Sequence, residues 1–422
     1  MKNLYFLICL IGAILISACS KDDNYVPVND DTENPSAPQN LMATTVTETA
    51  IQLSWDASAD NVGVTGYDIY VDGSIATSGV TGNTGSVTGL DQETTYSIYV
   101  IALDAAGNES DSSNVLSATT AAAPLEFKTQ LTEMGVYAGG LANLNPASGV
   151  QLYEINSTLF TDHAAKQRLI KLPNGSSMEF NNSDLLPNFP NNTLIAKTFY
   201  YNVNDQNPSE GKIIIETRIL IKQEEGWQVG NYIWNESQTE ATLRDTGSTI
   251  PISYIDINGT TQNIDYQIPS TQDCFQCHNN TNETFPIGMK LRSMNFVPSY
   301  TGQNQLDYFI ANGLLTGLSN TSQVSVLPDW QDETNFSLSE RARAYIDINC
   351  AHCHSPGGSV PPVYNLDLRY ETSFGASGIF DAREEIEARF ASTIPLYRMP
   401  LLGRTIVHED ALQLISDYVD SL

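Results

Sequence analysis

The sequence predicts a multidomain chain that begins with an all-β sandwich, continues with a second β-rich domain and ends in a mainly α-helical domain. Three patterns predict this order. Short runs of alternating apolar and polar residues, separated by glycines, fill residues 37–120. Strand-like runs rich in β-branched and aromatic residues recur across 124–268, and apolar residues at helical spacing occupy 269–422.

The composition limits the classes of partner. Hydrophobic residues make up 41% of the 422 residues, enough to form real cores, so wholesale disorder is excluded. The chain has 20 Lys and Arg against 49 Asp and Glu, a formal net charge of −29. Nonspecific binding to nucleic acid is therefore not expected, because phosphates would be repelled.

The N-terminus has the pattern of an export signal. An apolar run over residues 4–16 follows a short basic start and is too short to span a membrane. The run ends in Ile16-Ser17-Ala18-Cys19, which resembles a bacterial lipobox. That resemblance implies removal of residues 1–18 and lipidation of Cys19; an ordinary signal peptide cleaved nearby is the alternative.

Residues 19–36 are polar and rich in Asp, Asn and Pro, as in a flexible tether. Their start, residues 20–23, resembles the acidic export tag of surface-exposed lipoproteins. This implies a lipid-anchored outer-membrane protein displayed at the cell surface, with a periplasm-facing anchor as the alternative. No other segment has 18 consecutive apolar residues, so the lipid would be the membrane attachment.

The first predicted domain, residues 37–120, has the features of a β-sandwich. Trp55 lies on an early strand, and Leu90 precedes Tyr96 by six residues, as in a tyrosine corner. The segment resembles a fibronectin type III domain, which implies a spacer or adhesion module and assigns no chemistry. No Lys or Arg occurs between residues 22 and 127, so binding of heparin-like polymers by this module is not expected.

The second predicted domain, residues 124–268, contains a hairpin signal. The strand-like runs are residues 193–201, 213–221 and 227–234. His163 is the only histidine of this region and is interpreted as a surface or packing residue. Glu216, Arg218 and Glu236 are interpreted as charges on a solvated strand face.

The chemistry is concentrated in the last third of the chain. Two pentapeptides, 274–278 and 350–354, have the form C-x-x-C-H, the pattern of covalent haem c attachment. Two thiols at this spacing reach the vinyl groups on one edge of a porphyrin, and the adjacent imidazole binds iron. The pattern therefore predicts two covalent haem c groups. The thiol tethers would be Cys274, Cys277, Cys350 and Cys353, and the proximal iron ligands His278 and His354.

Three other uses of these cysteines are weighed against haem. A four-cysteine zinc site is disfavoured because the two pairs lie far apart in the sequence and both histidines would be unexplained. A thioredoxin-like redox pair needs a βαβ context that is not visible. Plain disulfides suit an exported protein but again leave the histidines without a role.

The second motif has a helical context. Residues 337–340 have the capping-box spacing and open a helix that leads into Cys350, and a second helical pattern closes the chain. Met399 stands in a proline-bearing loop before that last helix and is predicted to be the distal ligand of the second haem. A core methionine is the alternative. His408 is interpreted as a surface residue and His352 as pointing away from iron.

The first motif is less determined. Met294 is the favoured distal ligand of its haem, Met289 is the second choice, and an open site is the third. The basic residues expected to pair with haem propionates are Arg292, Arg398 and Arg404.

Several short stretches from about residue 125 onward resemble a little-characterised family of bacterial dihaem c-type cytochromes, in which a β-rich region precedes a class I cytochrome c-like domain. They are residues 156–162, 197–201, 216–218, 234–236, 349–354 and 399–404. The resemblance implies haem and a redox role, without a substrate.

The function expected from these patterns is electron transfer through two haems in a membrane-anchored protein. Its acidic surface would suit a basic redox partner. A dihaem peroxidase-like enzyme and an adhesion lipoprotein with an accessory redox domain are the alternatives. No catalytic residue is assigned.

Overall fold

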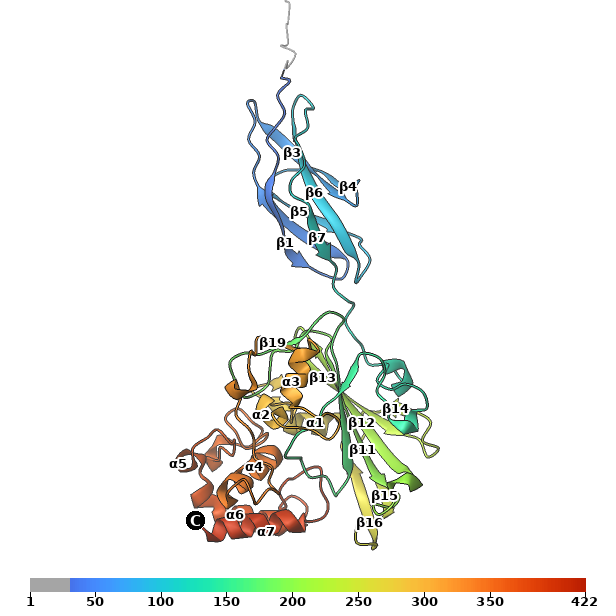
Figure 1. Ribbon diagram of the computed structural model, residues 1–422, viewed down its shortest axis with the longest axis vertical. Coiled ribbons are helices and arrows are strands. Elements are labelled where there is room, and N and C mark those ends of the chain that lie inside the picture. Colours follow the sequence, from blue (N-terminus) through green and yellow to red (C-terminus); the bar gives the residue numbers. More distant parts are fainter. Residues whose placement is uncertain (1–30) are drawn as a thin grey trace, which may run out of the picture. The chain divides into compact units, whose positions relative to one another are not determined.

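The computed structural model describes residues 31–422 and divides the chain into two compact units (Figure 1). Unit 1 ends at Ala123, and unit 2 runs from Pro124 to Leu422. The sequence-based boundary at 268/269 falls inside unit 2. Within the described residues, no helix combines the length and the apolar character needed to cross a bilayer.

Unit 1 is a sandwich of two antiparallel sheets, with strand orders β1-β2-β5 and β4-β3-β6-β7. Its strands are β1 (Gln39–Val46), β2 (Ala50–Asp56), β3 (Val64–Val71), β4 (Ser74–Val80), β5 (Thr84–Thr88), β6 (Thr95–Asp104) and β7 (Leu116–Thr119). Trp55 is buried at 2% exposure and packs edge-on against Tyr67. The Tyr96 hydroxyl accepts a hydrogen bond of 2.8 Å from the Asp91 amide, and Leu90 packs on the core, which confirms the predicted tyrosine corner.

Unit 2 is organised around a six-stranded antiparallel sheet with the order β14-β13-β12-β11-β9-β8. Its strands are β8 (Val150–Leu152), β9 (Ala165–Lys171), β11 (Leu194–Asn202), β12 (Lys212–Gln223), β13 (Gly226–Trp234) and β14 (Ala241–Leu243). Three of these match the runs expected from the sequence, because β-branched and aromatic residues suit a pleated, buried surface.

Both faces of this sheet are covered. Leu169, Ala196 and Ile219 point to one face and pack with the 3₁₀ segments at 131–134 and 141–143. Residues of the opposite parity form a second cluster with the helices α1 (Thr271–Cys277), α2 (Leu291–Met294) and α3 (Gln305–Ala311), which lie on that side in Figure 1. The short 3₁₀ segments elsewhere are Pro208–Glu210, Thr321–Gln323 and Pro362–Tyr364.

Smaller strand pairs complete the β structure. They are the hairpin β15 (Ser248–Ile255) and β16 (Thr261–Ile268), the hairpin β17 (Asn279–Asn280) and β18 (Glu283–Thr284), and the parallel pair β10 (Met178–Glu179) and β19 (Leu315–Thr316). The parallel pair joins the segment before β11 to the segment after α3, so unit 2 is tied together across a long sequence separation.

The C-terminal helices form a cluster beside the sheet (Figure 1). They are α4 (Leu338–Cys350), α5 (Phe374–Ser377), α6 (Ile379–Ala391) and α7 (Glu409–Asp420). The predicted capping box is present, since Ser337 accepts from the Glu340 amide and the Glu340 side chain accepts from the Ser337 amide. Tyr345 of α4 and Tyr418 of α7 share one buried core.

The fold prediction is therefore confirmed at the coarse level: an all-β sandwich is followed by further β-rich structure. The mainly helical character of residues 269–422 has narrower support. Helices α1 to α3 share their hydrophobic cluster with the large sheet, because Cys274, Met294 and Phe309 pack with Ile195 and Leu220.

Candidate functional site

The two C-x-x-C-H segments, far apart in the sequence, lie in contact in unit 2. The Sγ atoms of Cys277 and Cys353 are 3.9 Å apart. The Thr281 amide donates to the Gly357 carbonyl at 2.8 Å, and Asn280 Nδ2 donates to the Pro356 carbonyl at 3.1 Å. The turn after the second motif is thus held against the β17–β18 hairpin that follows the first.

Gly357 allows this close approach. Its φ is +82°, and a Cβ at this position would overlap the side chains of Asn280 and Thr281. Only glycine meets both demands without strain.

The first motif lies on α1 and its C-cap. Ser270 caps the helix in a capping box with Asp273, which fixes where the turn bearing Cys274 and Cys277 begins. His278 follows as the C-cap residue, and its Nδ1 lies 2.8 Å from the Phe285 carbonyl. Donation from Nδ1 to this carbonyl leaves Nε2 as the free ligand atom.

His278 is held in its neutral form. Burial is the main cause that lowers its pKa to about 3, and the neighbouring Lys197 adds to the effect. A neutral imidazole is the form that binds a metal.

The second motif begins at the last residue of α4. His354 is half-buried, and its Nδ1 has no hydrogen-bond partner in the described part of the chain. His352 is 9% exposed and its Nδ1 is likewise unpartnered among residues 31–422. Buried imidazole nitrogens without partners are uncommon in proteins and indicate a missing ligand or ion.

The contact between the motifs also creates a three-ligand cluster. One ligand atom each from Cys277, His352 and Cys353 lie within 4.8 Å of one another. The Cys277 thiol and His352 lower the pKa of Cys353, which favours the thiolate. His352, expected to point away from the site, is therefore part of it.

The methionines occupy two different settings. Met294 and Met289 are fully buried in the cluster that contains Cys274. Met399 is half-buried in the loop before α7, where its amide donates to the Arg389 carbonyl at 3.0 Å. The structure holds no iron against which their predicted roles as distal ligands could be measured.

The arginines expected to bind propionates already have protein partners. Arg292 pairs with Asp347 and Glu371, and Arg398 donates to Gln267. Arg404, 1% exposed, donates to five backbone carbonyls. Their hydrogen-bonding capacity is largely used inside the protein.

The strand charges at 216–218 are not solvated, contrary to the sequence-based interpretation. Glu216 is fully buried, and Arg218 donates to it through Nε and Nη2. Tyr266 and Asn231 each donate to the same carboxylate at 2.7 Å. The sequence alternation located these residues on a strand face but could not show that other elements cover the face.

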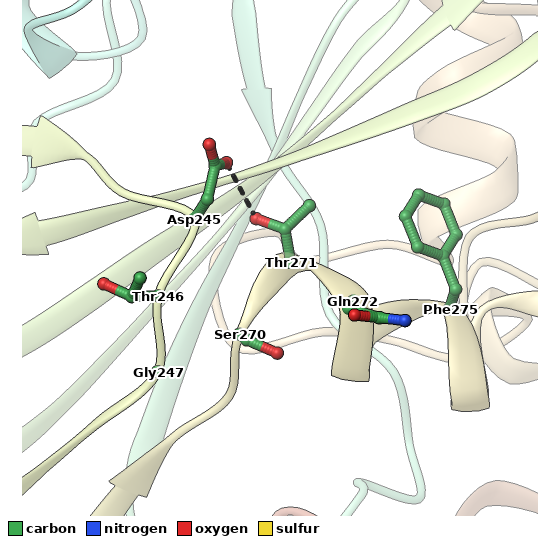
Figure 2. A pocket seen from close by; sticks show the side chains of 7 residues that line it. All are labelled: Asp245, Thr246, Gly247, Ser270, Thr271, Gln272 and Phe275. Carbon is green, nitrogen blue, oxygen red and sulfur yellow. Dashed lines mark hydrogen bonds between the residues drawn. The ribbon is translucent and has the colours of Figure 1, made fainter.

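A groove of about 550 Å³ adjoins the first motif (Figure 2). Its lining is Asp245, Thr246, Gly247, Ser270, Thr271, Gln272 and Phe275. Figure 2 shows the hydrogen bond from the Thr271 hydroxyl to Asp245, which is 3.1 Å long. The Phe275 side chain is 39% exposed, so the groove combines an accessible aromatic ring with polar groups.

The two remaining histidines lie together elsewhere. His163 is exposed, as expected, and its ring lies edge-on to Phe160 and His408. His408, expected on the surface, stacks on Phe160 with a centroid distance of 4.1 Å, and its Nδ1 lies 2.9 Å from the Tyr345 hydroxyl. The predicted lipidation site, Cys19, lies outside the described residues.

Comparisons with known proteins match the first unit. A family model described as "Fibronectin type III domain" matches residues 36–119. Chitinase A1 of Niallia circulans is 53% identical over 92 residues, which are 22% of this chain and 13% of that protein. Chitinase Chi52 of Paenibacillus xylanexedens is 51% identical over 90 residues, 21% of this chain and 17% of that protein. Exoglucanase B of Cellulomonas fimi is 44% identical over 94 residues, 22% of this chain and 8% of that protein.

The chain spans only 8% to 17% of the length of these three relatives. The match confirms the fibronectin type III domain predicted for residues 37–120. Residues 124–422 are interpreted from their own geometry.

The comparisons correct the family and the function expected from the sequence. The relatives named above are two chitinases and an exoglucanase, and none is a cytochrome. The predicted membership in a dihaem c-type cytochrome family is therefore wrong. The electron-transfer role derived from it is withdrawn, together with the peroxidase and adhesion alternatives.

Proposed function

We propose that this chain is an exported, carbohydrate-active protein in which residues 36–119 are a spacer and unit 2 carries the functional site. The spacer role is supported by the relatives that share the domain, which are a glucanase and chitinases of much greater length. The observation that carries the location of the site is the contact between the two C-x-x-C-H segments, with Cys277 and Cys353 3.9 Å apart.

The groove beside Phe275 is the proposed sugar-binding surface. A pyranose ring presents apolar C–H faces and a rim of hydroxyls, which suit an exposed aromatic ring and the polar side chains of Thr271 and Gln272. Hydrolysis of a glycosidic bond normally uses two carboxylates, and Asp245 is the only carboxylate in the groove lining. Binding is therefore proposed for this groove.

A pull-down with insoluble chitin and cellulose tests the groove. The parent chain should sediment with at least one polymer, and the double variant Asp245→Asn/Gln272→Ala should lose most of that binding. Gln303→Ala changes an exposed glutamine on a different loop and should bind as the parent does. Equal binding by all three chains would contradict a role for the groove.

Covalent haem c is the proposed cofactor of the paired motifs, because the residues present fit it. Each motif offers two unbonded thiols and one imidazole. His278 is oriented by the Phe285 carbonyl, and the buried Nδ1 of His354 lacks a partner within the described chain. When bound, haem would supply an iron centre able to change oxidation state.

Under this proposal the protein residues have fixed roles. The tethers are Cys274, Cys277, Cys350 and Cys353; the proximal ligands are His278 and His354; the distal ligands are Met294 and Met399. Burial of Met294 and of the first motif excludes water from that side of the site.

A divalent metal ion such as zinc is the second candidate occupant. The cluster of Cys277, His352 and Cys353 supplies soft thiolate and imidazole ligands in close proximity. The two candidates exclude each other at these thiols, since a thioether sulfur has no thiolate left to give to zinc.

The occupant is identified by producing the chain with and without haem-maturation machinery. The expected result is two porphyrin masses per chain and a matching pyridine haemochrome, with one porphyrin lost in Cys274→Ala/Cys277→Ala. Matured protein that is colourless and contains one equivalent of zinc would reject haem and support the metal cluster.

Membrane attachment through a lipid on Cys19 is also proposed, from the lipobox-like sequence. The parent chain should incorporate labelled palmitate and partition into detergent, whereas Cys19→Ser should do neither. Protease added to intact cells distinguishes a surface-exposed anchor from a periplasm-facing one.

A further inference from the structure

Three basic residues form a row across adjacent strands of the large sheet. Arg168 of β9 is the register partner of Lys197 of β11, and Lys197 is the partner of Arg218 of β12. Like charges directly opposite one another destabilise a sheet. The row is also unusual for a chain with a net charge of −29.

The row shares its sheet face with the first C-x-x-C-H motif. Side chains two positions along the same strands, Ile170, Ile195 and Leu220, pack in one cluster with Cys274. Because side chains two residues apart point to the same side of a sheet, the cationic row faces the same side as this cluster. Lys197 lies close enough to His278 to lower the pKa of its imidazole.

The positive charge of the row is not neutralised by the protein. Its carboxylate is Glu216, whose oxygens already accept hydrogen bonds from Arg218, Asn231 and Tyr266. Arg168 is 6% exposed, and its Nε has no hydrogen-bond partner in the described chain. Lys197 makes no hydrogen bond or ion pair with any residue of 31–422.

Burying an unpaired charge is costly, so such a row is retained where a ligand supplies the missing charge. Burial is the main cause that lowers the pKa of Lys197 to about 7, and Arg168 and Arg218 lower it further. Lys197 is only half-buried, so its ammonium is accessible to a ligand.

We propose that Arg168 and Lys197, with Arg218 beside them, form a binding site for carboxylate groups of a ligand. Two ligands share this chemistry. One is the pair of propionates of a porphyrin attached at the first motif, which rests on the proposed haem; the other is the uronate of an acidic polysaccharide. Arg168 and Lys197 replace the three arginines expected from the sequence, because those guanidiniums are paired within the protein.

The test uses the full chain with Lys197→Gln and Arg168→Gln, and Lys212→Gln as a matched control. Lys212 is an exposed lysine at the start of β12. In the matured chain, the midpoint potential of the haem is measured. Loss of a cation beside a propionate leaves a negative charge that favours ferric iron, so both variants should have a lower potential than the parent and the control. In the unmatured chain, binding of an oligogalacturonate is measured by calorimetry, with a neutral oligosaccharide of the same length beside it.

The outcomes separate the two proposals. A lower potential in both variants supports the carboxylate site with porphyrin as the ligand. A matured chain without porphyrin, in which oligogalacturonate affinity falls at least tenfold in both variants, rejects the haem and supports the site with an acidic sugar. Potentials and affinities that match the parent, or neither ligand bound at all, overturn the carboxylate site.

A stability measurement guards against variants that fail to fold. Because Lys197→Gln removes like-charge repulsion, the ligand-free variant should unfold at the parent's temperature or above it. Unfolding at a clearly lower temperature would assign Lys197 a structural role and overturn the proposal.

Discussion

Asp347 is a buried carboxylate of α4 on which several donors converge. Lys290 Nζ lies 2.8 Å from it, Arg292 Nη2 3.2 Å and the Tyr370 amide 2.9 Å. Lys290 and Arg292, with these hydrogen bonds, outweigh the effect of burial and lower the pKa of Asp347. The residue therefore holds α4 against the segment that carries Met294.

Replacing Asp347 with Ala should destabilise unit 2 by about 3–5 kcal/mol, since it leaves buried cations without their partner. Urea unfolding measures the loss, and Asp307→Ala, at an exposed position of α3, should cost far less. The lowered pKa means that the parent keeps this stabilisation above about pH 4 and loses it as the pH falls further. An Asp347→Ala chain as stable as the parent at pH 7 would contradict this role.

His408 gives unit 2 a second dependence on pH. Burial lowers its pKa from 6.5 to about 4, and His163 lowers it further. Between these values the unfolded chain binds a proton that the folded chain does not, so stability should fall as the pH drops from about 6.5 to 4. In His408→Phe, which keeps an aromatic ring on Phe160, this decline should become shallower in a urea series from pH 7 to 4. An unchanged decline would exclude His408 as its source.

At the residue scale, the sequence identified the motif cysteines and histidines from spacing, and the tyrosine corner from Leu90 and Tyr96. It missed the proximity of His352 to the thiols and the burial of Glu216. These properties depend on which segments meet after folding, and no local spacing reports that.

At the scale of elements, the approach of the turn at 355–358 to the β17–β18 hairpin depends on Gly357. Gly357→Ala places a Cβ where Asn280 and Thr281 lie, and overpacking of this kind costs about 1–3 kcal/mol. The two segments should therefore separate, and the unmatured variant should form a Cys277–Cys353 disulfide with diamide much more slowly than the parent.

Gly375→Ala is the control for this experiment, since a Cβ there meets nothing within 4 Å. Mass spectrometry of the cross-linked peptides follows the reaction. Equal rates in the three chains would show that the glycine does not control the approach of the motifs.

Helix boundaries could be predicted better than sheet faces. The capping residues Ser337 and Glu340 mark the start of α4 through local hydrogen bonds, and the periodicity of its apolar residues predicts the core shared with α7. On β12, by contrast, both faces are covered, so Arg218 and Ile219 are alike in burial potential although one is charged. Strand alternation therefore did not show where the polar residues would lie.

At the scale of the whole molecule, the division at Ala123 and Pro124 predicts two independent folding units. A chain lacking residues 31–123 should unfold with the same midpoint as unit 2 in the full chain, measured by calorimetry. It should also keep the same porphyrin or metal content. A lower midpoint in the truncated chain would show that unit 1 stabilises unit 2.

The domain order could be predicted in part. The sandwich has its own core, so its local alternation and turns were sufficient. Unit 2 combines residues from 150 to 348 in one hydrophobic cluster, and this non-local packing made the β-rich region and the first motif appear separate in the sequence. The cytochrome family assignment failed because it was drawn from short stretches, whereas the matching family model lies on the sandwich.

The meeting of Cys277 with Cys353 sets an order of events during biogenesis. Cys274 is 5% exposed once unit 2 has closed, so an enzyme that modifies it must act while the chain is still open. The first motif also leaves the export channel ahead of its counterpart, with an interval in which its thiols have no neighbour from the second. Whichever chemistry reaches the sulfurs during that interval decides what the finished protein holds.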